Sequence, residues 1–118
     1  MQHYVLVFHV TRTVTPDEAK KRAEEIAAYV KQVTGMGIEL DPKALGKTVV
    51  MLSSKDGKVV ESHEPSDPSF TNLLFFDASE EQALTVARIH PGLHYGTTVE
   101  LREWSSPKQA AAATAEAR

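Results

Sequence analysis

The sequence predicts an α+β fold in which two helices cover one face of an antiparallel sheet. Three observations support this prediction. The chain opens on an alternating apolar strand, two capping boxes each introduce an amphipathic segment, and an Asp-Gly pair joins two short β-rich runs. With 118 residues and no cysteine, the chain has the length of one domain, and its stability must come from packing rather than from disulfides.

The first predicted strand runs from Tyr4 to Val10 (YVLVFHV) and is largely apolar on both faces. Side chains alternate along a strand, so the even-numbered residues share one face. The odd-numbered residues Val5, Val7 and His9 share the other. We therefore expect this strand to be covered on both sides.

The first helix is predicted from its capping box. Thr15 caps the free amides, Pro16 fits the first turn and Glu18 completes the box. An Ala/Ile/Val stripe then recurs at helical spacing over about 19 residues. Gly35 and Gly37 end the helix.

The middle of the chain predicts a hairpin. The runs Lys47 to Ser53 (KTVVMLS) and Lys58 to His63 (KVVESH) flank Asp56-Gly57, which suits a tight turn with positive φ angles. These runs are expected to be antiparallel neighbours in the sheet. The segment from Glu64 to Ser69 is a polar loop with two prolines.

The second half repeats the pattern of strand, helix and strand. A doubly apolar strand is predicted at Phe70 to Asp77, a second capping box at Ser79 to Gln82 opens a short helix, and Pro91 stops it. The last strand is Thr97 to Trp104. The sequence thus predicts one domain over residues 1–105 and an Ala-rich tail, 106–118, that is a frayed helix or disordered.

The predicted order of strand, helix, hairpin, strand, helix and strand is that of a ferredoxin-like sandwich. Both helices lie on one side of such a sheet, so its other face is left apolar. An exposed apolar face favours aggregation. We therefore expect a second copy of the chain to cover it through a two-fold interface.

The chain resembles the YCII-related, or DGPF-domain, family of the dimeric α/β barrel superfamily. The residues that carry the resemblance are YVLVFHV at Tyr4 to Val10, the hairpin Asp56 to Val60, FFDASEEQALTVARIHP at Phe75 to Pro91, and Gly96 to Arg102. The Asp-Gly-Pro-Phe signature itself is absent, since the region after the hairpin reads Ser62-His63-Glu64-Pro65.

The resemblance implies a homodimer of the dimeric α/β barrel type. Some members of the family are similar to small lyases or isomerases that act on ring compounds. Others are encoded beside extracytoplasmic sigma factors, which implies a regulatory role. The resemblance therefore leaves both an enzyme and a non-catalytic module open.

Two residues are candidates for catalysis. His9 is the polar side chain on the Val5 and Val7 face, where an imidazole can act as a general base, and Asp77 ends a central strand. The alternative for His9 is a histidine at a strand end, satisfied by backbone or water. His90 and His94 flank Pro91 and are expected to be surface loop residues rather than metal ligands.

Four further residues are candidates for ligand binding. Glu100, Arg102 and Trp104 share one face of the last strand and can form a polar wall with an aromatic floor. The alternative is a cross-strand ion pair or a dimer contact. Tyr95 can hydrogen-bond a ligand at a cavity mouth or pack with its hydroxyl in water.

The leading hypothesis is a homodimer that binds a small organic molecule in a cavity, with a cofactor-free isomerisation or elimination as its chemistry. A non-catalytic binding or accessory module is the alternative. With 13 Lys and Arg against 16 Asp and Glu, scattered along the chain, no footprint for nucleic acid is present. No apolar run reaches the length of a membrane span, so a cytoplasmic location is expected.

Overall fold

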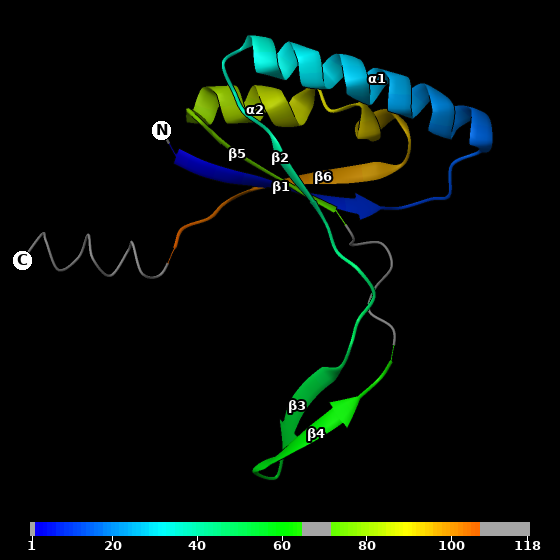
Figure 1. Ribbon diagram of the computed structural model, residues 1–118, viewed down its shortest axis with the longest axis vertical. Coiled ribbons are helices and arrows are strands. Elements are labelled where there is room, and N and C mark those ends of the chain that lie inside the picture. Colours follow the sequence, from blue (N-terminus) through cyan, green and yellow to red (C-terminus); the bar gives the residue numbers. More distant parts are fainter. Residues whose placement is uncertain (1, 65–71, 107–118) are drawn as a thin grey trace, which may run out of the picture.

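A four-stranded antiparallel sheet forms the centre of the protein in the computed structural model, which describes residues 2–64 and 72–106 (Figure 1). The strand order is β2-β5-β1-β6. These strands are β1 (Gln2–Val10), β2 (Asp41–Ala44), β5 (Asn72–Ala78) and β6 (Thr97–Glu103).

Two helices, α1 (Pro16–Gly35) and α2 (Glu80–Arg88), lie on one side of this sheet (Figure 1). A short 3-10 helix, η1 (Pro91–His94), leads into β6. The predicted α+β fold with an antiparallel sheet and two helices is confirmed, and the strand order is consistent with a ferredoxin-like sandwich. The predictions for residues 65–71 and for the tail 107–118 lie outside the described residues.

The hairpin is confirmed, but its predicted place in the main sheet is wrong. Strands β3 (Met51–Lys55) and β4 (Lys58–Ser62) pair only with each other and form a second sheet. The turn residues Asp56 and Gly57 have φ angles of 53° and 78°, as a tight hairpin turn requires. The Asp56-Gly57 turn sets which residues of β3 and β4 pair with each other, but it does not determine which sheet the hairpin joins.

The place of the hairpin in the main sheet is taken by β2, a strand that the sequence did not predict. Its residues, DPKA, belong to types that are depleted in strands. Pro42 lacks a backbone N–H, and β2 accommodates it because it is an edge strand that pairs only with β5. Its position is therefore decided by the neighbouring strand rather than by its own propensity.

The first capping box is confirmed and extended by an arginine. The Thr15 hydroxyl accepts a hydrogen bond from the Glu18 amide at 3.2 Å, and the Glu18 carboxylate accepts one from the Thr15 amide at 3.0 Å. Arg12 donates to the same carboxylate at 2.9 Å. The Arg12 guanidinium, followed by the Thr15 amide, lowers the pKa of Glu18 to about 2.

Removing this cap is expected to weaken the domain measurably. Thr15→Ala should lower the free energy of unfolding by about 1 kcal/mol, because the Glu18 amide loses its acceptor. Urea unfolding followed by circular dichroism measures this. Thr13→Ala, at another exposed position in the same loop, is the matched control and should change stability by less than about 0.5 kcal/mol. Equal losses in the two variants would contradict the role of Thr15.

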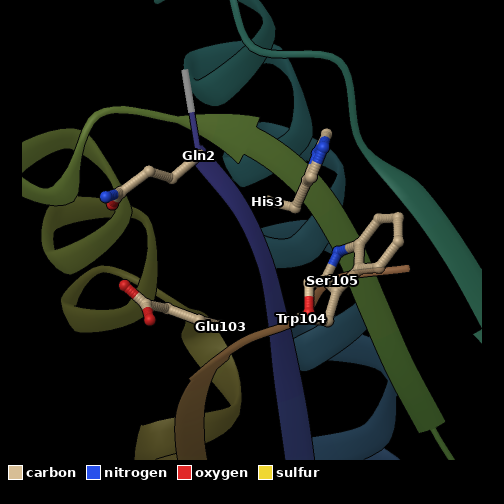
Figure 2. A pocket seen from close by; sticks show the side chains of 5 residues that line it. All are labelled: Gln2, His3, Glu103, Trp104 and Ser105. Atoms are coloured by element: carbon tan, nitrogen blue, oxygen red, sulfur yellow. The ribbon is translucent and has the colours of Figure 1, made fainter. Parts of the chain in front are cut away.

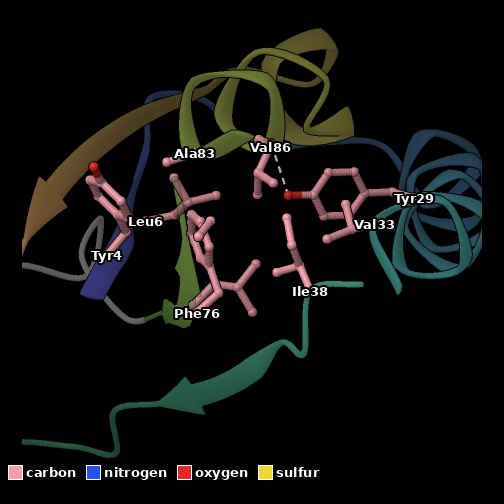
Figure 3. Packing of buried hydrophobic residues seen from close by; sticks show 10 residues of the cluster. Tyr4, Leu6, Tyr29, Val33, Ile38, Phe76, Ala83 and Val86 are labelled. Atoms are coloured by element: carbon pink, nitrogen blue, oxygen red, sulfur yellow. Dashed lines mark hydrogen bonds between the residues drawn. The ribbon is translucent and has the colours of Figure 1, made fainter. Parts of the chain in front are cut away.

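The core lies between the sheet and the two helices (Figure 3). Its buried residues are Tyr4, Leu6, Tyr29, Val33, Ile38, Leu74, Phe76, Ala78, Ala83 and Val86. The Tyr29 hydroxyl donates a hydrogen bond to the Val86 carbonyl at 2.9 Å, which ties α1 to α2. Burial raises the pKa of this phenol.

His90 is buried in this core, and its predicted place at the surface is wrong. Its ring lies 4.6 Å from the ring of Phe8 and 4.8 Å from that of Tyr29. Its Nδ1 accepts a hydrogen bond from the Gly92 amide at 3.0 Å. Burial lowers the pKa of His90 to about 4. The tight turn into η1 folds the ring back over the sheet, which the spacing of His90 and Pro91 alone does not reveal.

Candidate functional site

The helices leave one face of the main sheet open, and this open face carries most of the polar residues singled out in the sequence. The side chains of paired residues in an antiparallel ladder point to the same side of the sheet. The pairing of the strands therefore shows which residues lie on the open face. The open face comprises His3, Val5, Val7 and His9 of β1, Leu73, Phe75 and Asp77 of β5, Thr98, Glu100 and Arg102 of β6 with Trp104 beyond it, and Asp41 and Lys43 of β2.

The centre of the open face is apolar. Val5 and Val7 are only 7% and 6% exposed although no helix covers them, and each lies between longer side chains of the two neighbouring strands in the ladder. Leu73 and Phe75 lie beside them on β5 and are half-buried. Four apolar side chains thus form a compact block in the middle of the sheet.

Charged side chains flank this block in an alternating pattern. Asp41 and Arg102 lie at the two ends of one ladder row, and Lys43 and Glu100 at the ends of the next. Along each outer strand the charges also alternate, with 3.2 Å between Lys43 Nζ and Asp41 Oδ1 and 3.8 Å between Arg102 Nε and Glu100 Oε2. Reading around the block, each charge is followed by one of opposite sign.

A histidine, a carboxylate and an indole meet at one end of the open face. His3 Nδ1 lies 2.5 Å from Asp77 Oδ1, and the His3 ring stacks on Trp104 with 4.7 Å between ring centroids. Phe75 meets the same indole edge-on at 5.9 Å. Figure 2 shows His3 and Trp104 on the same side of β1. We call His3, Asp77 and Trp104 the His3 cluster.

A shallow hollow of about 450 Å³ borders the His3 cluster. Gln2, His3, Glu103, Trp104 and Ser105 line it. In Figure 2 the side chains of Gln2 and Glu103 extend to the opposite side of β1 from those of His3 and Trp104. The hollow therefore lies around the end of β1 and is open to solvent in a single chain.

His9 lies at the other end of the open face. Its Nε2 is 3.1 Å from Glu100 Oε1, and its side chain is 39% exposed. Six residues of extended chain separate it from His3, a distance of about 20 Å. The two catalytic candidates named from the sequence, His9 and Asp77, are therefore not brought together: Asp77 pairs with His3, and His9 pairs with Glu100.

Sequence reasoning missed His3 because it began the first strand at Tyr4. The structure begins β1 at Gln2, so His3 joins Val5, Val7 and His9 on the same face. The period of two was visible in the sequence and would have found His3 if the strand had been extended by one residue towards the N-terminus.

Tyr95 lies apart from the other candidates, on the helix-covered side of the sheet. It is 9% exposed, and a hydrogen bond with the Glu25 carboxylate of α1, together with burial, raises the pKa of its phenol. The interaction with Glu25 places Tyr95 against α1 rather than over the open face. Tyr95 thus packs against the helix in a single chain.

Within residues 2–64 and 72–106, no three His, Cys, Asp or Glu side chains gather closely enough to hold a metal ion. In the same residues, the helices are too short or too polar to cross a membrane.

No known family model matches this sequence, and no curated protein matches it. The solved structures to which the chain is similar include two de novo designed proteins. Ferredog-Diesel is 13% identical with a TM-score of 0.44, over 89% of this chain and 85% of its own. Foldit4 is 15% identical with a TM-score of 0.44, over 90% of this chain and 99% of its own. Neither likeness bears on the family or the activity of this chain.

Proposed function

We propose that this protein is a homodimer that binds a small planar organic molecule at the His3 cluster and catalyses its isomerisation or elimination without a cofactor. His3 is the general base of this reaction. The observation that carries the proposal is the 2.5 Å contact between His3 and Asp77 beside the face of Trp104. It supplies a base, a group that orients the base, and an apolar surface for a ring.

The proton arrangement follows from the chemistry of the pair. An ionised Asp77 only accepts hydrogen bonds, so His3 carries its proton on Nδ1 and leaves Nε2 with a free lone pair. Nε2 then removes a proton from the substrate, and the Asp77 carboxylate stabilises the imidazolium that forms. Imidazole suits this task near neutral pH.

Trp104 supplies the binding surface in this proposal. Its indole stacks on the His3 ring, lies perpendicular to the Phe75 ring and is 40% exposed. A planar ring stacked on an aromatic face gains about 0.5–1.5 kcal/mol beyond the area it buries. The hollow beside it has the volume of a typical small-molecule site.

The alternating charges of the open face support a homodimer in which a second copy of the chain covers that face. When two open faces meet about a two-fold axis parallel to the strands, residues at opposite ends of each ladder row face one another. Arg102 then meets Asp41 of the partner subunit, and Lys43 meets the partner's Glu100. Opposite charges face each other at all four corners while the apolar blocks stack, so the pattern is self-complementary. The partner's main sheet would also cover the His3 and Trp104 side of the hollow.

The catalytic part of the proposal is tested with nitrobenzisoxazole, a planar bicyclic compound whose ring opens when a base removes its ring C–H proton and the N–O bond breaks. The wild type should accelerate this opening with saturation. His3→Asn should lower the rate by about 10² or more, and Asp77→Asn should lower it while leaving the imidazole in place. The release of the coloured phenolate product measures the rate.

His9→Asn is the matched control, because His9 is an equally exposed histidine at the far end of the same strand. It should leave the rate unchanged. Trp104 is the single tryptophan of the chain, so its fluorescence reports binding at the His3 cluster directly. A His3→Asn variant with the full wild-type rate would remove His3 as the base.

A non-catalytic binding or regulatory module is the second candidate function. The observation that favours it is that the charges of the open face already pair with one another, as the residues of an interface do. In that case nitrobenzisoxazole would quench Trp104 fluorescence or leave it unchanged, and no acceleration of ring opening would be measured.

A further inference from the structure

The β3-β4 hairpin is a two-stranded sheet whose apolar side chains lack cover. Every residue of β3 is exposed, and on β4 only Ser62 is partly covered. Leu52 is 60% exposed and Val59 is 73% exposed. Met51 and Val60 are exposed on the other side of the hairpin, since neighbours along a strand alternate. A two-stranded hairpin is only marginally stable alone in water, so this one needs a surface to pack against.

The hairpin stands on the open side of the main sheet, opposite the helices (Figure 1). The chain that leads to it leaves from β2, an edge strand. Five residues of β3 span about 17 Å, whereas two sheets packed face to face lie about 10 Å apart. A hairpin in this position is therefore long enough to reach beyond the main sheet of a partner subunit that is stacked on the open face.

The main sheet of a partner subunit would present a suitable edge to the β3-β4 hairpin. β6 pairs only with β1, so the outer edge of its seven residues, Thr97 to Glu103, has backbone N–H and C=O groups without a strand neighbour among the described residues. The other sheet edge, β2, is shorter and contains Pro42, which cannot donate. β6 is thus the better edge for adding a strand.

We propose that the hairpin of each protomer pairs with the outer edge of β6 in the partner, so that the two subunits clasp each other. This inference rests on the homodimer proposed above and specifies its geometry. A two-fold axis parallel to the strands places the partner's β6 edge beneath the protomer's own β2 edge, where the hairpin leaves the sheet. Rotation about an axis across the strands would instead bring the two β2 edges together.

The positive charge at the tip of the hairpin is complementary to the acidic end of β6. Lys55 and Lys58 are directly opposite each other in the ladder, and like charges in that position repel. β6 ends on the exposed Glu103. A carboxylate such as Glu103 of the partner subunit relieves the repulsion between the two lysines.

A cross-linking experiment tests the clasp, because the chain has no cysteine and any introduced thiol is unique. One sample of the protein carries Ser53→Cys in the hairpin and another carries Thr98→Cys in β6. The two are mixed, left to exchange subunits and treated with a short bismaleimide. The proposal expects a covalent dimer that contains one chain of each variant, identified by mass spectrometry.

The other outcomes overturn the clasp. Cross-links of Ser53→Cys chains with one another in place of the mixed dimer would show that the hairpins meet each other. Absence of any covalent dimer would show that the hairpin packs elsewhere. Sedimentation of the protein without cross-linker shows separately whether a homodimer forms. A dimer that gives no mixed cross-link would rule out the clasp but not the homodimer, whereas a monomer would rule out both.

A charge-reversal variant gives an independent measurement. The pair K55E and K58E should weaken the dimer about tenfold or more in dissociation constant, because the tip then repels the acidic end of β6. K20E and K21E, on exposed positions of α1, make the same change of net charge far from the hairpin and are the matched control. Equal effects of the two pairs would contradict the clasp, since net charge alone would then explain the weakening.

Discussion

Leu6→Ala is expected to lower the free energy of unfolding by about 2–5 kcal/mol. Leu6 is fully buried at the centre of β1, where its ladder partners are Leu74 on β5 and Leu101 on β6. Truncation removes its packing against the core and leaves a cavity that the surrounding β-strands cannot fill without moving. A loss of this size is a large fraction of the stability of an ordinary domain.

Urea unfolding at a fixed protein concentration measures this loss, and Val10→Ala is its matched control. Val10 lies on the same face of the same strand but is 39% exposed at the strand end. It should cost less than about 1 kcal/mol, since it removes less buried surface. A loss below that value for Leu6→Ala would mean that Leu6 is not the centre of the core.

Acidification from pH 7 to pH 4 is expected to remove about 3 kcal/mol of stability through His90 alone. Burial lowers the pKa of His90 to about 4 in the folded protein, from an ordinary value of 6.5. The unfolded chain therefore binds more protons in this window, and the free energy of unfolding falls as the pH falls. Above pH 6.5 the contribution is fully present, and it is lost by the time the pH reaches about 4.

His90→Asn isolates this effect. The Asn side chain keeps an acceptor for the Gly92 amide but does not titrate, so the variant should lose most of the pH dependence between pH 7 and pH 4. It should also be less stable at pH 7, because the ring contacts with Phe8 and Tyr29 are gone. His94→Asn, exposed in the same turn, should retain the wild-type slope. A wild-type slope in His90→Asn would contradict the prediction.

His3 and His90 both contact aromatic rings but differ in their exposure and in their neighbours. His90 is enclosed by aromatic side chains on the helix side, where the charged form is disfavoured, so its role is structural. His3 is 40% exposed on the open face and has the Asp77 carboxylate beside it. Under the proposed function, the exposed His3 rather than the enclosed His90 is therefore the base.

Sequence alone was sufficient for the local elements of this protein. The helix starts at Thr15 and Ser79 and the hairpin turn at Asp56-Gly57 were predicted correctly, because each depends on hydrogen bonds or φ angles within a few residues. The alternation along the first strand likewise predicted which of its residues share a face, although only the structure shows that the even-numbered face meets the helices. Such features need no knowledge of distant parts of the chain.

Only the tertiary structure decided the features that depend on distant pairing. β2 is a strand because β5 lies beside it, and His90 is buried because the turn before β6 folds it over Phe8. The His3 cluster likewise joins residues more than 70 positions apart. The ladder register brings His3 to Asp77 and Trp104, and register is set by the burial of a whole strand face, which no short motif encodes.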